Sequence, residues 1–313
     1  EPPTNLTLSN NSVNENVNNG TEIGTFTTTD PDSNNTFTYT LDTTGVPFVI
    51  DSDKLKTTGA IDYETQAEYS IDVTSNDGSN NITRTFTIYV NNMNEPPTNL
   101  TLSNNSVNEN VNNGTEIGTF TTTDPDSNNT FTYTLDTTGV PFVIDSDKLK
   151  TSGTIDYETQ TEYSIDITSN DGSNNITRTF TIYVNNINEP PTEITLSNTS
   201  VDENTEIGFV VGTFTTTDVD SDSFTYTLNT ADVPLVIDGD KLKTSGALDY
   251  ETQTTYTIEV TSNDGTNDIV KSFTITVNDV NEPPTNLTLS NNSVNENVNN
   301  GTEIGTFTTT DPD

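Results

Sequence analysis

Val277-Asn-Asp-Val-Asn-Glu-Pro-Pro-Thr285 is the stretch of sequence that decides the fold, and it recurs with small changes at 90–98 and 184–192. Two successive prolines cannot donate backbone hydrogen bonds to a β-ladder, and they hold the preceding residue extended. The stretch therefore cannot continue the apolar strand before it. It predicts a stiff linker between domains, and this linker carries the side-chain oxygens of Asp279, Asn281 and Glu282.

The linker repeats at a nearly constant interval. Its Glu-Pro-Pro begins at residues 1, 95, 189 and 282. The 313 residues therefore divide into three full modules, predicted at 1–94, 95–188 and 189–281, and a partial fourth at 282–313. The first two modules are almost identical, whereas the third has diverged and is one residue shorter. Because the chain ends in mid-module, we expect it to be part of a longer array of neighbouring modules.

The chain is strongly acidic and contains no cysteine. Its 48 Asp and Glu residues against 9 Lys and Arg give a net charge of −39. Nucleic acid and anionic membranes are poor partners for it, because phosphate binding needs a basic footprint. Solubility or salt tolerance would also explain the acidity. The positions of the acids in the fold must therefore decide between this general explanation and a specific role for the acids. Without Cys, neither disulfides nor thiol metal sites can form, and no membrane-spanning segment is visible.

Apolar residues alternate with polar ones, although a hydrophobic content of only 28% would suggest disorder. Thr fills most of the intervening positions, as expected of half-buried antiparallel strands. No stretch shows helical spacing. Turn residues divide each module into seven strands, predicted in the first module at 5–9, 22–28, 36–42, 47–50, 54–57, 67–74 and 82–91. We therefore expect an all-β chain of tandem seven-stranded Greek-key β-sandwiches.

Acidic residues far apart in the sequence should meet at the joints between modules. Antiparallel neighbours alternate in direction, so the loops of a sandwich lie at two opposite poles. One pole of the first module and the facing pole of the second then collect one set of oxygen-bearing side chains. This first set is Glu15, Asp62, Glu64, Asn92, Asn94, Glu95, Asp124, Asp126 and Asp171.

Equivalent sets recur at the other joints. The second set is Glu109, Asp156, Glu158, Asn186, Asn188, Glu189, Asp218, Asp220 and Asp264. The third set, cut short by the end of the chain, is Glu203, Asp249, Glu251, Asp279, Asn281, Glu282, Asp311 and Asp313. A half-set without a partner module is Glu1, Asp30, Asp32 and Asp77, and we expect it to bind weakly or to need an upstream module.

The chemistry that such sets favour is calcium binding. Carboxylates crowded at one joint repel one another by about 1 kcal/mol per pair at 4 Å even in water, and a divalent cation removes that penalty. Calcium accepts six to eight oxygens in loose geometry, from carboxylates, Asn side chains and backbone carbonyls. Magnesium demands a tight octahedron, and zinc prefers the nitrogen or sulfur ligands that His and Cys would supply.

Each motif also has a plainer explanation when it is taken alone. Asp30-Pro-Asp32 is a good turn, Asp62-Tyr-Glu64 fits a solvated strand end, and Asp77-Gly78 fits a hairpin. The calcium hypothesis depends on their convergence at common poles. Asp51 and Asp53 lie at no joint, and we assign them no role.

With these residues in place, the modules resemble cadherin repeats, and more narrowly the cadherin-like domains of large bacterial surface adhesins. The family's glutamate after its first strand matches Glu15, its Asp-x-Glu matches Asp62-Tyr-Glu64, and its Asp-x-Asp matches Asp30-Pro-Asp32. Its aspartate in the loop between the last two strands matches Asp77. Its Asp-x-Asn-Asp-Asn-x-Pro linker matches Asp279-Val-Asn-Glu-Pro-Pro. The resemblance implies two or three calcium ions per joint, a stiff, elongated rod and a place at the cell surface.

The sequence departs from the family pattern in the linkers. Asn92 and Asn186 replace the leading Asp, and Pro96, Pro190 and Pro283 replace the final Asn. One calcium position at the first two joints is therefore expected to be weaker or vacant. The chain has no Trp, so the strand-swapping adhesion of animal cadherins is not expected.

Three other functions were weighed. Catalysis is disfavoured because Ser-His-Asp and Cys-His arrangements cannot be built, and a catalytic carboxylate pair in every module is implausible. Calcium-assisted carbohydrate binding, with glycans as partners, remains an alternative, with Tyr63 and Tyr89 as the candidate exposed aromatics. Assembly with other copies into an extracellular filament is another. The favoured prediction is a calcium-stiffened extracellular spacer that forms the stalk of an adhesin.

Overall fold

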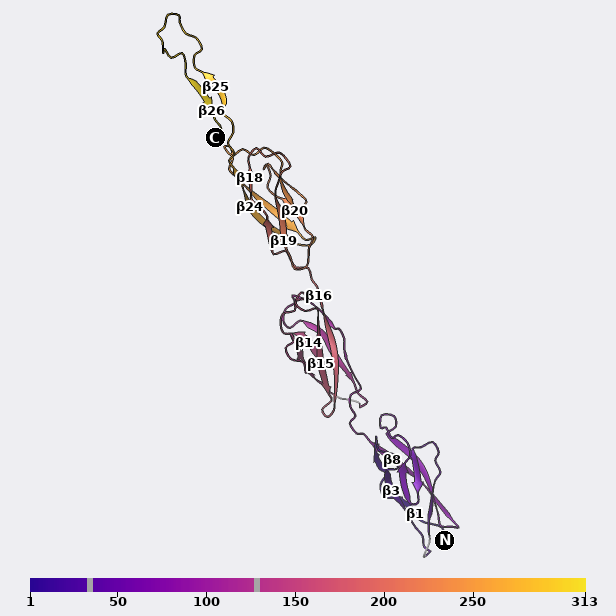
Figure 1. Ribbon diagram of the computed structural model, residues 1–313. Coiled ribbons are helices and arrows are strands. Elements are labelled where there is room, and N and C mark those ends of the chain that lie inside the picture. The colour runs from indigo at the N-terminus through magenta and orange to yellow at the C-terminus, as the bar shows by residue number, and fades with distance from the viewer. Residues whose placement is uncertain (33–35, 127–129) are drawn as a thin grey trace. The chain divides into compact units, whose positions relative to one another are not determined.

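The structure is a computed structural model that describes residues 1–32, 36–126 and 130–313 (Figure 1). The chain divides into two compact units, Glu1–Asn185 and Asn186–Asp313, and each is described by itself. Throughout the described residues the secondary structure consists of strands and turns. That part of the chain accordingly offers no helix that could cross a membrane.

The first unit begins with one β-sandwich. Its strands are β1 (Asn5–Leu8), β2 (Ser12–Asn14), β3 (Glu22–Thr29), β4 (Thr38–Leu41), β5 (Phe48–Asp51), β6 (Lys54–Thr57), β7 (Glu68–Asn76) and β8 (Asn81–Asn91). One sheet has the order β1-β3-β6-β5 and the other β2-β8-β7-β4. Alternate side chains from both sheets, among them Leu6, Phe26, Ile71 and Ile88, are buried between them.

The second sandwich of the first unit repeats this topology. Its strands are β9 (Asn99–Leu102), β10 (Ser106–Asn108), β11 (Glu116–Thr123), β12 (Thr132–Leu135), β13 (Phe142–Asp145), β14 (Lys148–Thr151), β15 (Glu162–Asn170) and β16 (Asn175–Asn185). The sheets run β13-β14-β11-β9 and β10-β16-β15-β12. Each of the two sandwiches encloses its own hydrophobic core.

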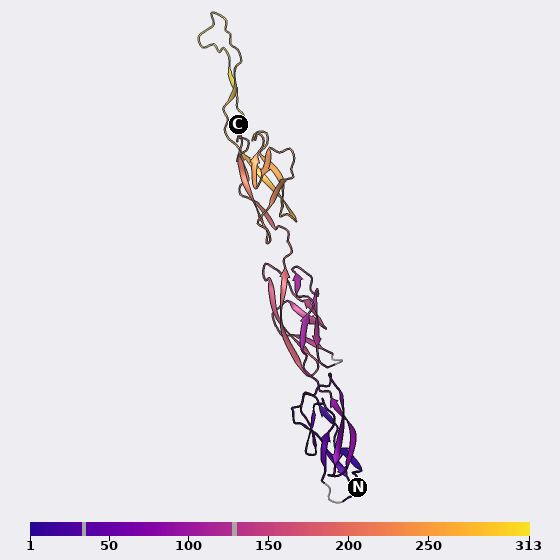
Figure 2. The ribbon, with the colours of Figure 1, turned by 90° about the vertical axis from the view of Figure 1, so that its right-hand side faces the viewer.

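The second unit contains a third sandwich and a two-stranded sheet (Figure 2). The sandwich strands are β17 (Glu193–Leu196), β18 (Ser200–Asp202), β19 (Val210–Thr217), β20 (Thr225–Leu228), β21 (Leu235–Asp238), β22 (Lys241–Thr244), β23 (Thr255–Asn263) and β24 (Asp268–Asn278). The small sheet pairs β25 (Thr285–Leu289) with β26 (Phe307–Thr310). The sandwich sheets run β17-β19-β22-β21 and β18-β24-β23-β20.

The predicted all-β class is confirmed, but the prediction of seven strands per sandwich missed one strand. The strand expected at 5–9 is followed by a further strand, β2, which lies in the opposite sheet and pairs with β8 in parallel rather than antiparallel. The crossing is held by Asn10, whose Nδ2 donates to the backbone oxygens of Ser12 and Ile23 at 2.8 Å each. The predicted module boundaries fall between the sets of strands and stay a prediction.

Candidate metal centre

Glu15 is the organising residue of the first set. Although charged, it is only 2% exposed. Its Oε2 accepts the backbone N–H of Tyr63 at 2.8 Å, and its Oε1 accepts that of Met93 at 2.6 Å. One carboxylate therefore ties together three segments: the loop after β2, the loop between β6 and β7, and the linker.

Further carboxylates gather around this buried group. One oxygen each of Glu15, Glu64 and Glu95 lie within 4.8 Å of one another. The pKa of Glu64 is raised, first because surrounding protein removes part of its water and then because neighbouring carboxylates repel its charge. The three acids come from different segments of the chain, as the convergence hypothesis required.

The second module meets the linker through the loop between β11 and β12 and the loop between β15 and β16. The backbone N–H of Glu95 donates to Asp126 Oδ2 at 2.7 Å, and Asp126 N–H donates to Asp124 Oδ1 at 2.9 Å. Asn94 Nδ2 donates to Asp171 Oδ2 at 3.0 Å. The pKa of Asp171 is lowered chiefly by the backbone N–H of Asn174. The linker is thus tied to both acidic loops of the second module.

Two members of the first set are placed differently. Both carboxylate oxygens of Asp62 accept hydrogen bonds from Thr65, at 2.9 Å from its N–H and 2.8 Å from its hydroxyl. Asp62 therefore lies outside the close group of three acids. Asn92 Nδ2 donates to Glu64 Oε1 at 2.9 Å, so in this arrangement Asn92 acts as a hydrogen-bond donor to a neighbouring acid.

Buried oxygens with unused lone pairs test whether the set fits a cation. Glu95 Oε2 and Asp124 Oδ2 are buried and have no hydrogen-bond partner among the described residues. Such an atom costs about 1–3 kcal/mol when it stays unpaired. Open, buried carboxylate oxygens on Glu95, which belongs to the close group, and on Asp124, in an acidic loop bonded to the linker through Asp126, are the donor chemistry that Ca²⁺ requires, so the residues fit this ion.

The members of the second set are described within each unit. In the first unit, oxygens of Glu109, Asp156 and Glu158 lie within 4.8 Å of one another. Glu109 is 2% exposed and accepts the N–H of Tyr157 at 2.8 Å. This group repeats the buried-glutamate arrangement of Glu15, but here the aspartate of Asp-x-Glu joins it.

In the second unit, the linker residues bind the acidic loops of the third module. Glu189 N–H donates to Asp220 Oδ2 at 2.7 Å, and Asn186 Nδ2 donates to Asp220 Oδ1 at 2.9 Å. Asn188 Nδ2 donates to Asp264 Oδ2 at 2.9 Å. Asp218 Oδ2 is buried without a hydrogen-bond partner in the described chain, as its counterpart Asp124 Oδ2 is.

The third set contains two overlapping groups. Oxygens of Glu203, Glu251 and Asp279 lie within 4.8 Å of one another, as do those of Glu251, Glu282 and Asp313. Glu203 accepts the backbone N–H groups of Tyr250 at 2.7 Å and Val280 at 2.8 Å. Asn281 Nδ2 donates to the backbone oxygen of Glu282 at 2.8 Å. Neither group includes Asp249 or Asp311.

The predicted half-set at the start of the chain keeps the same local geometry. Asp32 N–H donates to Asp30 Oδ1 at 2.7 Å, and Asp77 Oδ1 accepts two backbone N–H groups of its own turn at 2.7 Å. Glu1 donates its terminal ammonium to Asp32. Asp30 Oδ2 is a buried oxygen without a partner among the described residues.

Sequence reasoning missed the Asn that follows each buried glutamate. Asn16 and Asn204 have φ of 60° and 56°, a left-handed conformation that Asn tolerates better than most residues. Asn16 Nδ2 donates to Glu95 Oε1 at 2.5 Å, and Asn204 Nδ2 donates to Glu282. The sequence did contain a signal for this contact. It is the pair Glu-Asn, in which Asn can end the strand by adopting the left-handed backbone conformation.

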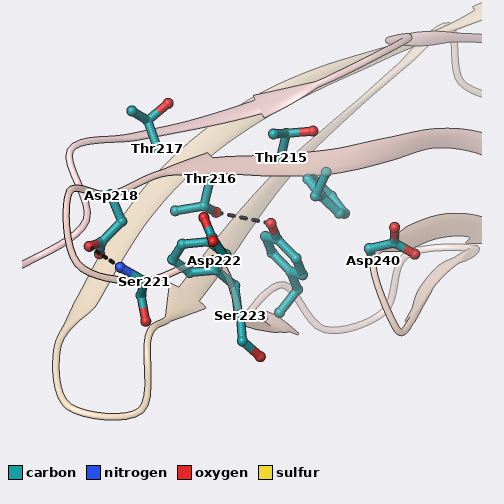
Figure 3. Close-up of a pocket in the computed structure, with 11 residues that line it drawn as sticks. Thr215, Thr216, Thr217, Asp218, Ser221, Asp222, Ser223 and Asp240 are labelled. Atoms are coloured by element: carbon teal, nitrogen blue, oxygen red, sulfur yellow. Dashed lines mark hydrogen bonds between the residues drawn. The ribbon is translucent and has the colours of Figure 1, made fainter.

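A groove in the third sandwich includes Asp218 of the second set in its lining (Figure 3). Its volume is about 620 Å³, and its lining includes Phe224, Asp222 and Asp240. Tyr226 also lines it, with its ring stacked on Phe214 at 5.3 Å and its hydroxyl accepting from Thr216 Oγ1 at 3.0 Å. Grooves of about 360 and 390 Å³ lie at the equivalent place in the first two sandwiches.

Comparison with known families identifies the modules. Residues 9–91 and 103–185 each match the cadherin domain, and together they make up more than half of the chain. Human protocadherin gamma-A10 is 29% identical over an alignment 282 residues long, which covers 81% of this chain and 30% of that protein. Human protocadherin gamma-A2 is 30% identical over an alignment 174 residues long, which covers 51% of this chain and 19% of that protein. The chain thus spans less than a third of the length of these relatives.

Solved structures share the fold. The extracellular domain of protocadherin GammaB4 has a TM-score of 0.69 at 21% identity, covering 99% of this chain and 56% of that one. Mouse cadherin-23 EC22-24 has a TM-score of 0.66 at 21% identity, covering 88% of this chain and 99% of that one.

These findings confirm the predicted cadherin-like fold and the predicted extracellular location. The relatives named are animal proteins, so the narrower resemblance to bacterial surface adhesins stays a prediction. With two modules matching the family's domain and the same sandwich built in each, this chain belongs to the cadherin family.

Proposed function

We propose that the chain is a calcium-stiffened extracellular spacer, in which Ca²⁺ bound by the acidic sets holds successive modules in one alignment. The observation that carries this proposal is the first set. Glu15 and Glu64 of one module and Glu95 of the linker place carboxylate oxygens within 4.8 Å of one another, and the linker in turn is bonded to Asp126 of the next module.

The metal would supply the positive charge that this cluster lacks. Glu15, Glu64, Glu95 and Asp124 are the residues we propose as its principal ligands, with Asp126 and Asp171 orienting the linker. From the resemblance to cadherin repeats we propose two to three ions per complete set. We propose Asp62 as a further ligand of the first set. By equivalence of sequence we propose the same for the other sets, including Asp249 and Asp311, which lie outside the close groups.

We further propose that the spacer forms the stalk of a bacterial surface adhesin. The near identity of the first two modules suits a long array that repeats one mechanical unit. Neighbouring modules of the same chain are its first partners. A catalytic role is not proposed, because the Asp-x-Glu pair recurs in every module and the chain has neither His nor Cys.

The experiment that tests calcium binding is thermal unfolding of the chain in calcium and in chelator. Ligands that bind only the folded state stabilise it by about 2.7 kcal/mol per site at a hundred times the dissociation constant. We expect calcium to raise the Tm, with saturation as calcium is titrated. An unchanged Tm at millimolar calcium would contradict the proposal, and magnesium at equal ionic strength is the control.

Carbohydrate binding is the second candidate function, and the groove beside Tyr226 favours it. An aromatic ring with nearby hydroxyls and carboxylates is suited to a sugar, and the net charge of −39 disfavours anionic glycans. Saturable binding of a neutral oligosaccharide that is lost in Tyr226→Ala and kept in Tyr63→Ala would support it. Tyr63 serves as control because it is 37% exposed and lies outside the groove lining.

A further inference from the structure

One stretch of seventeen residues occurs three times in the chain without a single change. The three copies span residues 16–32, 110–126 and 297–313, and each contains the pair Asn-Gly, at 19–20, 113–114 and 300–301. Because the neighbouring residues in the sequence are identical, any difference in the chemistry of these three pairs must come from the structure around them.

Asn-Gly is a pair at which asparagine can lose its side-chain amide. The backbone nitrogen of the glycine gives up its proton and attacks Cγ of the asparagine, so that a C–N bond forms, the Cγ–Nδ2 bond breaks and ammonia leaves. Water then opens the succinimide ring to aspartate or isoaspartate. Glycine favours the ring closure because it has no Cβ to obstruct it. A hydrogen bond that holds the proton of the glycine nitrogen opposes the reaction.

In the first module this nitrogen is held by the last residue of β6. Gly20 N–H donates to the backbone oxygen of Thr57 at 2.7 Å, and Thr57 N–H donates back to the oxygen of Thr21 at 3.0 Å. Thr57 is 1% exposed, and its Oγ1 accepts Thr21 N–H at 3.1 Å and donates to the oxygen of Asn18 at 2.9 Å. Four hydrogen bonds thus tie the turn to the sheet.

The second module repeats this tie at its own Asn-Gly pair. Gly114 N–H donates to the backbone oxygen of Thr151 at 2.7 Å. Thr151 Oγ1 accepts the N–H of Thr115 at 3.1 Å and donates to the oxygen of Asn112 at 2.8 Å. The side chains of Asn19 and Asn113 are exposed to water. At both sites, therefore, the amide and water are available, and it is the glycine nitrogen that is withheld.

The third copy forms the same turn without the tie. Gly20, Gly114 and Gly301 all have a φ of 87°. Thr302 N–H donates to the oxygen of Asn299 at 3.1 Å, just as its counterpart in the first module closes the turn at 3.2 Å. Gly301 N–H has no acceptor among the residues that the structure describes. The turn conformation is therefore common to the three copies, and the hydrogen bond of the glycine nitrogen is what differs.

We propose that Asn19 and Asn113 are deamidation sites that are kept closed by the pairing of β3 with β6 and of β11 with β14. Each site then reacts only while its turn has opened locally. The reaction replaces a neutral side chain by a carboxylate, or adds a methylene to the backbone as isoaspartate, so the modified fraction records how long each module has spent open. The third module carries Ile207 before Gly208 and lacks the site. This inference goes beyond the proposed spacer and does not rest on calcium binding.

The test is prolonged incubation of the whole 313-residue chain in mildly alkaline buffer, followed by peptide mass spectrometry. Trypsin leaves the three pairs in the distinct peptides 1–54, 85–148 and 272–313. We expect Asn300 to lose its amide at least about tenfold faster than Asn19 and Asn113. In denaturant the three rates should become equal, because the local sequences are identical. Equal rates in the folded chain, or a faster reaction of Asn300 in denaturant as well, would overturn the proposal.

Thr57→Val tests the tie itself. The variant keeps the shape of this buried side chain but removes the hydroxyl that bonds Thr21 and Asn18, so the turn of the first module should open more often. Deamidation of Asn19 should accelerate at least about fivefold. Asn113, whose module keeps its own threonine, is the matched control in the same chain and should react at its wild-type rate. Equal rates at Asn19 and Asn113 in this variant would overturn the proposal, and the comparison within the wild-type chain does not depend on how the variant folds.

Discussion

At the scale of single residues, Glu15 is a charged side chain that the protein keeps almost out of water. Its two oxygens satisfy the backbone N–H groups of Tyr63 and Met93. It therefore has a structural role without metal, in addition to its proposed role as a ligand. Glu109 and Glu203 occupy the same position in their own modules.

Glu15→Gln should lower the stability of the first module by about 2 kcal/mol, because the amide leaves one buried N–H without an acceptor. In calorimetry the first module should then melt below the almost identical second module. Hydrogen exchange should show faster exchange at Tyr63 or Met93. Glu68→Gln, at the exposed start of β7, is the control. Equal stability of Glu15→Gln and wild type would refute this role.

Tyr69 provides a pH-dependent prediction. Burial raises its pKa, and Asp62 raises it further. A group whose pKa is higher in the folded state stabilises fully below the unfolded value of about 10 and loses this contribution as pH rises. Stability should therefore fall above about pH 10. Denaturant unfolding of wild type and Tyr69→Phe across this pH range would check it, because the variant lacks the ionising hydroxyl and should lose less stability. An equally steep fall in Tyr69→Phe would contradict the prediction.

The identity of the candidate ligands was predictable, but their hydrogen bonds were not. Asp-x-Glu, Asp-x-Asp and the linker carry recognisable spacing, and their convergence followed from strand direction alone. Sequence could not show that Thr65 occupies both oxygens of Asp62. It also could not show that Asn16 turns left-handed to reach Glu95. Such contacts depend on rotamers and on the exact loop path.

At the scale of elements, the crossing between β1 and β2 is what the strand pattern failed to predict. The apolar alternation at Leu6 and Leu8 predicts a strand but does not say which sheet the next residues join. Tertiary packing decides it: Asn10 closes the crossing against β3, and Gly24 permits the close approach. The other strands followed from alternation and turn residues to within a few positions.

Gly24→Ala should destabilise the first module by about 2–4 kcal/mol, since a Cβ there would lie 2.4 Å from the backbone oxygen of Asn10. In calorimetry the first module of this variant should melt at a lower temperature than the second module. Gly59→Ala is the milder control, because its Cβ would lie 3.1 Å from Cβ and 3.7 Å from Cα of Pro47. A Gly24→Ala chain with unaltered melting would show that the crossing is not tightly packed.

At the scale of the whole molecule, the repeat of about 94 residues predicted the tandem sandwiches, because each linker interrupts the ladder with two prolines. What these fold signals do not predict is how the surfaces of the modules differ. The exchange of Glu22 for Val210 alters no fold signal, yet it changes the surface from a salt bridge to an exposed apolar side chain.

Asp124→Ala should weaken calcium binding by the first set and leave the third set unchanged, because Asp124 contributes an open buried oxygen to the first set alone. Calorimetric titration should show at least one high-affinity site fewer per chain. Asp147→Ala removes an equal charge from the exposed turn between β13 and β14 and should keep every site. An unchanged number of sites in Asp124→Ala would remove Asp124 from the ligands.

Small-angle scattering of the chain in calcium and in chelator tests the spacer account most directly. If metal at the acidic sets fixes the alignment of modules, calcium must increase the maximum dimension and narrow its distribution, and chelator must reverse both changes. Superimposable scattering curves under the two conditions, at a calcium concentration that saturates binding, would contradict the account.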